Sequence, residues 1–425
     1  MDALQVCIIA GVIVAFGLVS RRLEGSPITM PMVFVAAGIA TEALGIVDLD
    51  IESESVALLA EVTLALILFS DASRIDTTSL RRELGLPARL LGVGLPLSIL
   101  LGSGLVALII PSLEIWEAAL VAAILAPTDA ALGQAVVEEP SVPLRVRQSL
   151  NVESGLNDGI ALPAVFLFAA LAADEEATSG FWLRFAAQQI GLGMLIGLAV
   201  GVIGAIAIDT ASKRHWIDGI NIQLVTLAFA VLALAGATAA GGNGFIAAFV
   251  AGLVFGTRSD QASSTIEYTE DSSRLLTALS FFVFGNVIAP DAASSLSFTI
   301  AICAIGTLTI GRILPVAIAT WSIRPNWRTV VFLGWFGPRG IASIVFALII
   351  VEDAPDGGAD VVLSIVTWTV LASVFLHGIT AGPLARRYGA WFHARADDHH
   401  TMVESGPATV NRSRFGSLPT TQEQK

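Results

Sequence analysis

Apolar stretches of about 17–25 residues recur along the chain, and short segments between them hold nearly all of its charge. That length matches what an α-helix needs to cross the hydrocarbon core of a bilayer. Only 14% of the 425 residues are charged and 55% are hydrophobic, whereas a soluble domain carries roughly 25% charged residues. The sequence therefore predicts an all-α, polytopic membrane protein.

The apolar stretches predict thirteen transmembrane spans. These lie at roughly 3–20, 28–47, 55–71, 87–110, 115–136, 148–172, 183–208, 219–240, 243–257, 274–290, 296–321, 329–351 and 360–383. Residues 1–384 would thus form the transmembrane domain. Residues 385–425 are polar and rich in Ser, Thr and His, which predicts a flexible cytoplasmic tail.

Basic residues alternate between the loops that join these spans. Odd-numbered loops carry arginine or lysine, from Arg21 and Arg22 in the first to Arg324 and Arg328 in the eleventh, whereas even-numbered loops are acidic or lack a base. Cytoplasmic loops are enriched in Lys and Arg. The pattern therefore places the C-terminus in the cytoplasm and the N-terminus outside, in a multi-pass protein of the cell (inner or plasma) membrane.

Two segments of similar character lie seven spans apart. Residues 120–133 read "LVAAILAPTDAALG" and residues 330–343 read "VVFLGWFGPRGIAS". Each has a proline near mid-span, Pro127 or Pro338, which removes a backbone donor and obstructs a helical turn. In lipid such a break is tolerated where it lines a cavity or is buried in protein, and paired breaks mark the binding sites of transporters.

Because seven spans separate these segments, they run in opposite directions across the membrane. This indicates an inverted repeat in which two broken helices cross. The first repeat covers about 3–172, the second about 219–383, and a linker helix at about 183–208 joins them. The alternative is that the two prolines are ordinary kinks in unrelated helices.

Acids lie inside the predicted membrane region, where a charge costs at least about 2.5 kcal/mol and is a functional candidate by default. Asp129 follows the Pro127 break, while Ser154 and Asp158 are four residues apart and share one helical face. Carboxylates, a hydroxyl and the carbonyls freed at a broken helix suit a hard cation. Partial desolvation favours the protonated form of a carboxylate, so a proton and a cation would compete for these oxygens.

A second polar pair on the same helix, Glu153 and Asn157, is rotated by about 100° from the first. Arg312 lies well inside the eleventh span and requires a partner there. A buried pair with Glu153 would hold the helices in register. Arg312 is the favoured partner and Arg339, at the Pro338 break, is the competing one. We interpret these four residues as structural rather than as ion ligands.

The motifs "APTDA" and "ESGLNDG", followed by a mid-span arginine and "GPRG", resemble the sodium/proton antiporters of the NhaP and NHE type. The resemblance extends over residues 3–383 and lies with the Asn-Asp motif branch of the monovalent cation:proton antiporters. It implies the NhaA/NhaP-like fold and a homodimer. Each protomer would have a dimerisation domain and a six-helix ion-binding domain that moves like an elevator.

The resemblance also implies roles for individual residues. Asp158 would carry the ion and the proton, Asp129 and Ser154 would assist, and Thr128 would contribute its backbone carbonyl. Asn157 stands where electrogenic relatives have a second aspartate, which implies electroneutral exchange of one Na⁺, Li⁺ or K⁺ for one proton. These ions are cargo. No organic cofactor or nucleic-acid partner is expected, only membrane lipid and a second copy of the chain.

This chain departs from the family at two positions. Ala126 stands where many members have an aspartate before Pro-Thr-Asp. At the end of the third span many members have Phe-x-Glu-Gly, whereas this chain has the shorter acid Asp71 two residues after Phe69. Asp71 is therefore either a further contributor to the ion site or a solvated helix terminus.

Other functions fit the residues less well. A sodium-coupled symporter for an organic solute would need aromatic or arginine anchors beside the acids, beyond the arginines already assigned. A potassium/proton exchanger is a variant of the antiporter. An enzyme is disfavoured because no His-Glu-x-x-His occurs and Ser154 has no neighbouring histidine to activate it. A channel is a further alternative, although paired broken helices favour alternating access.

Overall fold

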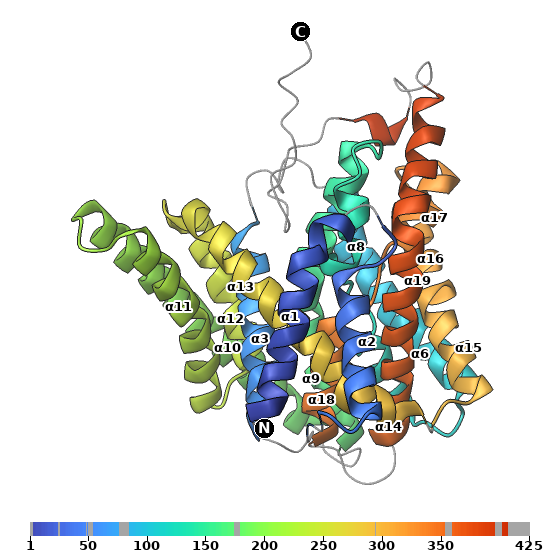
Figure 1. Ribbon diagram of the computed structural model, residues 1–425, viewed down its shortest axis with the longest axis horizontal. Helices are drawn as coiled ribbons and strands as arrows, with labels where there is room; N and C mark the ends of the chain where they lie inside the picture. The colour runs from blue at the N-terminus through green and yellow to red at the C-terminus, as the bar shows by residue number, and fades with distance from the viewer. Residues whose placement is uncertain are drawn as a thin grey trace.

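The computed structural model describes residues 3–23, 26–47, 49, 54–75, 85–173, 179–293, 295–352, 359–395 and 402–406. Every regular element in these ranges is helical (Figure 1). The elements are α1 (Ala3–Leu23), α2 (Met30–Ala43), α3 (Glu54–Ser73), α5 (Leu86–Arg89), η1 (Leu90–Gly94), α6 (Leu95–Ile109), α7 (Ile115–Ile124), α8 (Ala130–Val137), α9 (Leu144–Ala173), α10 (Ser179–Lys213), α11 (Gly219–Ala239), α12 (Gly244–Arg258), α13 (Ala262–Val283), η2 (Phe284–Ile288), α14 (Ala289–Ala293), α15 (Phe298–Leu308), α16 (Ile310–Thr320), α17 (Trp327–Trp335), α18 (Ile341–Glu352), α19 (Ala359–His393) and η4 (Val403–Ser405).

The predicted polytopic helical fold is confirmed, and each predicted span coincides with a helix or with consecutive helices. Seven helical stretches among the described residues are long and apolar enough to cross a membrane. They are Ala3–Leu23, Leu86–Ile109, Leu144–Ala173, Ala187–Lys213, Gly219–Ala239, Phe298–Thr320 and Asp360–His393. The remaining predicted spans fall on α2, α3, α12, α13 with η2, and the interrupted pairs α7–α8 and α17–α18. These are not among the seven, so the number thirteen stays a prediction.

The helices pack as two groups. The first group comprises α1–α3 and α10–α14 with η2; within it α12 packs against α3, α10 and α11, and α2 packs against α13 and η2. The second group comprises α5–α9 with η1 and α15–α19, in which α7 packs against α6 and α9 and α19 packs against α15 and α18. Figure 1 shows α10–α13 on the left and α15–α17 and α19 on the right. The groups meet where α9 contacts α3, α10 and α12, where α18 contacts α3, and where α19 contacts α14 and α2.

Glycines bring two pairs of helices into backbone contact within the first group. A Cβ at Gly38 of α2 would overlap the carbonyl oxygen of Phe282, at the end of α13, and a Cβ at Gly252 of α12 would overlap that of Phe69 in α3. The predicted second span thus meets the tenth, and the ninth meets the third. Two inverted repeats produce this pairing. Their symmetry relates span two to span nine and span three to span ten, so a contact between spans two and ten has its equivalent between spans nine and three.

Two helices are interrupted at the predicted prolines. Residues 125–129 separate α7 from α8, and residues 336–340 separate α17 from α18, with Pro127 and Pro338 in the middle of their segments. The fixed φ of proline and its missing N–H favour a break at both positions. The two crossed broken helices expected from the sequence are therefore present.

The last long helix continues beyond residue 384, where the polar composition predicted that the membrane domain ends. α19 runs to His393, and Tyr388 and Phe392 in its last turns are buried. Apolar packing on one face therefore extends this helix despite Arg386 and Arg387. Of the predicted tail, residues 396–401 and 407–425 lie outside the described residues.

Candidate functional site

The two broken helices are joined by Asp129. Its backbone N–H donates to the carbonyl of Pro338 at 2.8 Å. Its Oδ1 accepts from the N–H of Ala131 at 2.7 Å and its Oδ2 accepts from the N–H of Ile341 at 3.0 Å. One carboxylate therefore caps the N-termini of both α8 and α18, where the helix dipoles favour negative charge.

Gly340 makes room for this arrangement, because a Cβ there would fall on the carboxylate of Asp129. The second glycine of the "GPRG" motif is thus required by the close approach of a side chain from the other half of the molecule.

Arg339 holds the C-terminal end of α7. Its Nη1 donates to the carbonyls of Ala126 and Pro127 at 2.6 and 3.0 Å, and its side chain is 2% exposed. A guanidinium at a helix C-terminus compensates the negative end of the dipole. The competing assignment, in which Arg339 pairs with Glu153, therefore gives way to a role at the first break.

Two serines and a histidine also form hydrogen bonds with backbone groups at the breaks. Ser343 donates to the carbonyl of Ile124 at 2.7 Å. Ser373 accepts the N–H of Arg339 at 2.6 Å and lies 3.2 Å from Nδ1 of His377. His377 Nε2 lies 2.7 Å from the carbonyl of Trp335, and its Nδ1 lies 3.0 Å from the carbonyl of Ser373.

None of these three residues was predicted to belong to the site. Single serines and a single histidine in apolar helices carry no pattern that distinguishes them from packing residues.

The face of α9 that was predicted to bind ions lies against Thr128 in the first break. Thr128 Oγ1 is 3.0 Å from Ser154 Oγ, and Asn157 Nδ2 donates to it at 2.7 Å. Asp158 lies one turn beyond Ser154 on the same face and is buried. The structure therefore brings Thr128, Ser154 and Asn157 into direct contact, with Asp158 beside them on α9.

Glu153 pairs with Arg312 of α16, the partner favoured from the sequence. Both side chains are almost fully buried, with 2% and 1% exposed. The Arg312 guanidinium lies so close to Gly337 that a Cβ there would collide with it. The ion pair consequently connects α9 to the second break.

Asp71 is buried near the end of α3, a helix that packs against both α9 and α18. It belongs to the first helical group, whereas the other candidate residues belong to the second. Its contribution to ion binding stays a prediction.

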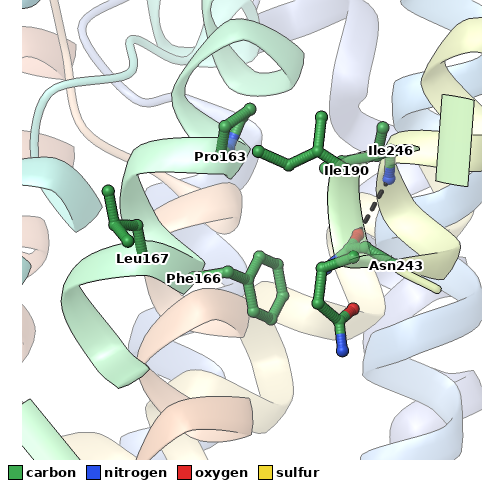
Figure 2. Close-up of a pocket in the computed structure, with 7 residues that line it drawn as sticks. Pro163, Phe166, Leu167, Ile190, Asn243 and Ile246 are labelled. Atoms are coloured by element: carbon green, nitrogen blue, oxygen red, sulfur yellow. Dashed lines mark hydrogen bonds between the residues drawn. The ribbon is translucent and has the colours of Figure 1, made fainter. Parts of the chain in front are cut away.

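A small pocket lies further along α9 and does not overlap the acids (Figure 2). Figure 2 shows Pro163, Phe166 and Leu167 on one helix, with Ile190, Asn243 and Ile246 across from them. Asn243 Oδ1 caps α12 by accepting from the N–H groups of Phe245 and Ile246. The pocket is lined by Pro163, Phe166, Leu167, Gln189, Ile190, Asn243 and Ile246, and the absence of a charged side chain among these described residues makes it a poor cation site.

Comparison with known proteins agrees with this architecture. The transmembrane model of the sodium/hydrogen exchanger family matches residues 8–387. The chain is 27% identical over 394 residues to the K⁺/H⁺ antiporter NhaP2 of Shewanella sp. (strain MR-4), covering 89% of this chain and 65% of that protein. It is 27% identical over 270 residues to a probable Na⁺/H⁺ antiporter of Schizosaccharomyces pombe, covering 59% of this chain and 35% of that protein.

A solved structure shares the fold. The sodium proton antiporter MjNhaP1 from Methanocaldococcus jannaschii superimposes with a TM-score of 0.74 at 19% identity, covering 91% of this chain and 98% of that one. The family model covers most of the chain, and the chain spans about 65% of the length of its NhaP2 relatives. The chain belongs to the sodium/hydrogen exchanger family.

Proposed function

We propose that this protein exchanges a monovalent cation for a proton across the cell membrane, and that the two ions compete for Asp158. The observation that carries the proposal is the contact between Thr128 in the first break and Ser154 on α9, at 3.0 Å. It sets a pair of hydroxyls near the buried carboxylate of Asp158, one turn from Ser154 on α9, and the backbone carbonyl of Thr128 is proposed as a further ligand. Such an oxygen-rich set suits Na⁺, Li⁺ or K⁺.

The three acids of the cluster take different roles in this proposal. Glu153 is assigned to the ion pair with Arg312, and Asp129 to the caps of α8 and α18 with an assisting role at the ion. In this proposal Glu153 and Asp129 keep these contacts whichever ion is bound. Asp158 shares its helical face with Ser154 and is assigned the exchanged charge.

The proposed stoichiometry is one cation for one proton. Asn157 donates from Nδ2 to Thr128, a bond that an ionised aspartate could not make because it only accepts. With an amide at this position Asp158 is the acid assigned to transport, so one positive charge enters for each that leaves.

The movement proposed is that of the second helical group against the first. The site residues Thr128, Ser154 and Asp158 all belong to the second group, which would carry the ion as one body. The first group would mediate contact with a second copy of the chain. The proposed orientation has the N-terminus outside and the C-terminus in the cytoplasm.

The cation itself has two candidates. The Shewanella NhaP2 relatives, which match 89% of this chain, are named as K⁺/H⁺ antiporters, whereas the Schizosaccharomyces pombe relative is named as a probable Na⁺/H⁺ antiporter. Potassium/proton exchange is therefore the second candidate function.

The test is proton flux in proteoliposomes that contain a pH-sensitive dye. Na⁺, Li⁺, K⁺ or choline is added to one side, at several pH values between about 5 and 9. Alkalinisation with one of the small cations but not with choline supports exchange and identifies the ion. No proton movement with any cation, from protein shown to be folded, would shift the assignment to a sodium-coupled symporter of an organic solute.

A further inference from the structure

A short segment after α19 returns to the body of the protein. The turn η4 packs against α9, and the side chain of Glu404 is 4% exposed. Its Oε1 accepts the backbone N–H of Asn326 at 2.8 Å and the hydroxyl of Thr329 at 2.6 Å. Acidic side chains are almost never this buried unless they are paired, so a specific role is expected.

The partners of Glu404 form a directed chain of donors. A carboxylate only accepts, so Thr329 donates its proton to Glu404 and therefore accepts from the hydroxyl of Tyr388, 2.8 Å away. Asn326 is the N-cap of α17, and its side chain accepts from the N–H of Arg328 at 3.0 Å.

Asn326 thus caps the N–H of Arg328, and Glu404 holds the N-cap residue itself and the Thr329 hydroxyl. α17 has nine residues, a length at which a helix depends on its surroundings for stability.

A second anchor joins the same turn to α9. Arg145 donates from Nη1 to the carbonyl of Val403 at 2.7 Å, and Gly406 lies directly against this guanidinium. Through Arg145 and Thr329 the turn is bonded to α9 and α17, and Thr329 in turn is bonded to Tyr388 of α19. Each of these hydrogen bonds is made to the second helical group, so the turn would travel with the ion site.

Aromatic packing continues the path from Glu404 to the second break. The ring of Tyr388 stacks on Phe332 with centroids 4.1 Å apart and planes 18° apart. Phe332 in turn contacts Phe336 at 4.7 Å. Phe336 is the C-cap of α17 and directly precedes Gly337 and Pro338. A continuous set of contacts therefore links the N-terminal end of α17 to the crossing of the broken helices.

We infer that Glu404 is a positioning residue for cation exchange: it fixes the N-terminal end of α17 and thereby the second break against Asp129. The inference rests on the proposed function. Glu404 touches neither ion and acts through α17 and its aromatic contacts. Its loss weakens cation binding more than it slows the transport step.

The experiment compares five variants in the proteoliposome assay, with the cation titrated at fixed pH. Glu404→Ala and a truncation after Arg395 both remove the carboxylate. A truncation after Gly406 removes only residues 407–425 and is the matched control. Glu404→Gln keeps an oxygen that can accept both hydrogen bonds.

We expect Glu404→Ala and the truncation after Arg395 to raise the half-saturating cation concentration roughly threefold to tenfold, as for couplings through packed contacts. Glu404→Gln and the truncation after Gly406 should stay within about twofold of wild type. Thr329→Val, which breaks the same chain from the other side, should resemble Glu404→Ala.

Equal half-saturation in wild type and in Glu404→Ala, with only the melting temperature lowered, would overturn the inference and leave Glu404 as a packing residue. A half-saturating cation concentration equal to wild type in Thr329→Val, when Glu404→Ala shows the expected rise, would likewise contradict the path through α17. Absence of exchange in the wild-type protein is a separate outcome, because it overturns the proposed function itself.

Discussion

The carboxylate of Asp129 accepts the N–H of Ile341 at 3.0 Å and so caps a helix that begins 212 positions further along the chain. With its other oxygen it caps its own helix. One side chain therefore holds together the two interruptions that the repeats create.

Removal of this double cap is expected to destabilise the protein in steps. In Asp129→Asn the amide oxygen can cap one helix, while its NH₂ group opposes the other N–H. Asp129→Ala loses both caps, each worth about 0.5–2 kcal/mol. Melting temperatures in detergent should fall in the order wild type, Asn, Ala. Equal values for the three proteins would contradict the capping role.

Asp158→Asn should abolish exchange with little change in melting temperature, because only the ionisable group changes. Ser154→Ala serves as the comparison, since it removes a neutral oxygen next to Thr128. We expect this variant to keep exchange with a higher half-saturating cation concentration. Wild-type flux in Asp158→Asn would refute the assignment of the exchanged charge.

The ion pair between Glu153 and Arg312 predicts a strong non-additive effect on stability. Either single alanine variant strands a buried charge, which costs about 3–5 kcal/mol. The double variant removes both charges and should be less destabilised than the sum of the two singles. Thermal unfolding of the three variants measures this difference, and simple additivity would argue against a direct pair.

Exchange of one cation for one proton predicts no dependence on membrane potential. The neutral Asn157 beside Thr128 is the basis of this expectation. Flux is measured once with a membrane potential imposed and once with the potential collapsed by an ionophore for an ion that the protein does not exchange. The two rates should be equal. A clear change in rate would indicate that a net charge crosses the membrane in each cycle.

Competition at a single carboxylate also sets the sign of the pH dependence. Lowering the pH places protons on Asp158, so the half-saturating cation concentration should rise, by at most about tenfold per pH unit for one proton displaced. The maximal rate at saturating cation should change less. A half-saturation that is independent of pH would indicate separate sites for the two ions.

The sequence predicted the features that depend on local patterns. Apolar run lengths predicted the helices, and Pro127 and Pro338 predicted where two of them break. The i, i+4 spacing of Ser154 and Asp158 predicted the face of α9 that meets the first break. These signals are local because a helix places residues four apart on one side whatever surrounds it.

Local patterns could not predict features that depend on backbone groups far away in the chain. Asp129 was predicted as an ion ligand, and nothing near it in the chain indicates a cap on α18. Both Arg312 and Arg339 were candidate partners for Glu153 because each is a lone arginine in an apolar span. The structure distinguishes them, because Arg339 binds the carbonyls of Ala126 and Pro127 and Arg312 pairs with Glu153. Glu404 is an isolated acid in a polar segment, and its burial depends on the position of α17.

The exchange of glycine contacts between the halves, with Gly38 against Phe282 and Gly252 against Phe69, has a consequence for thermodynamics. If one half packs against the other as its inverted copy does, the conformations open to the two sides of the membrane are made of equivalent contacts and should have similar free energies. Neither side is then preferred by the protein. Without ion gradients, the forms open to the two sides would then be populated about equally.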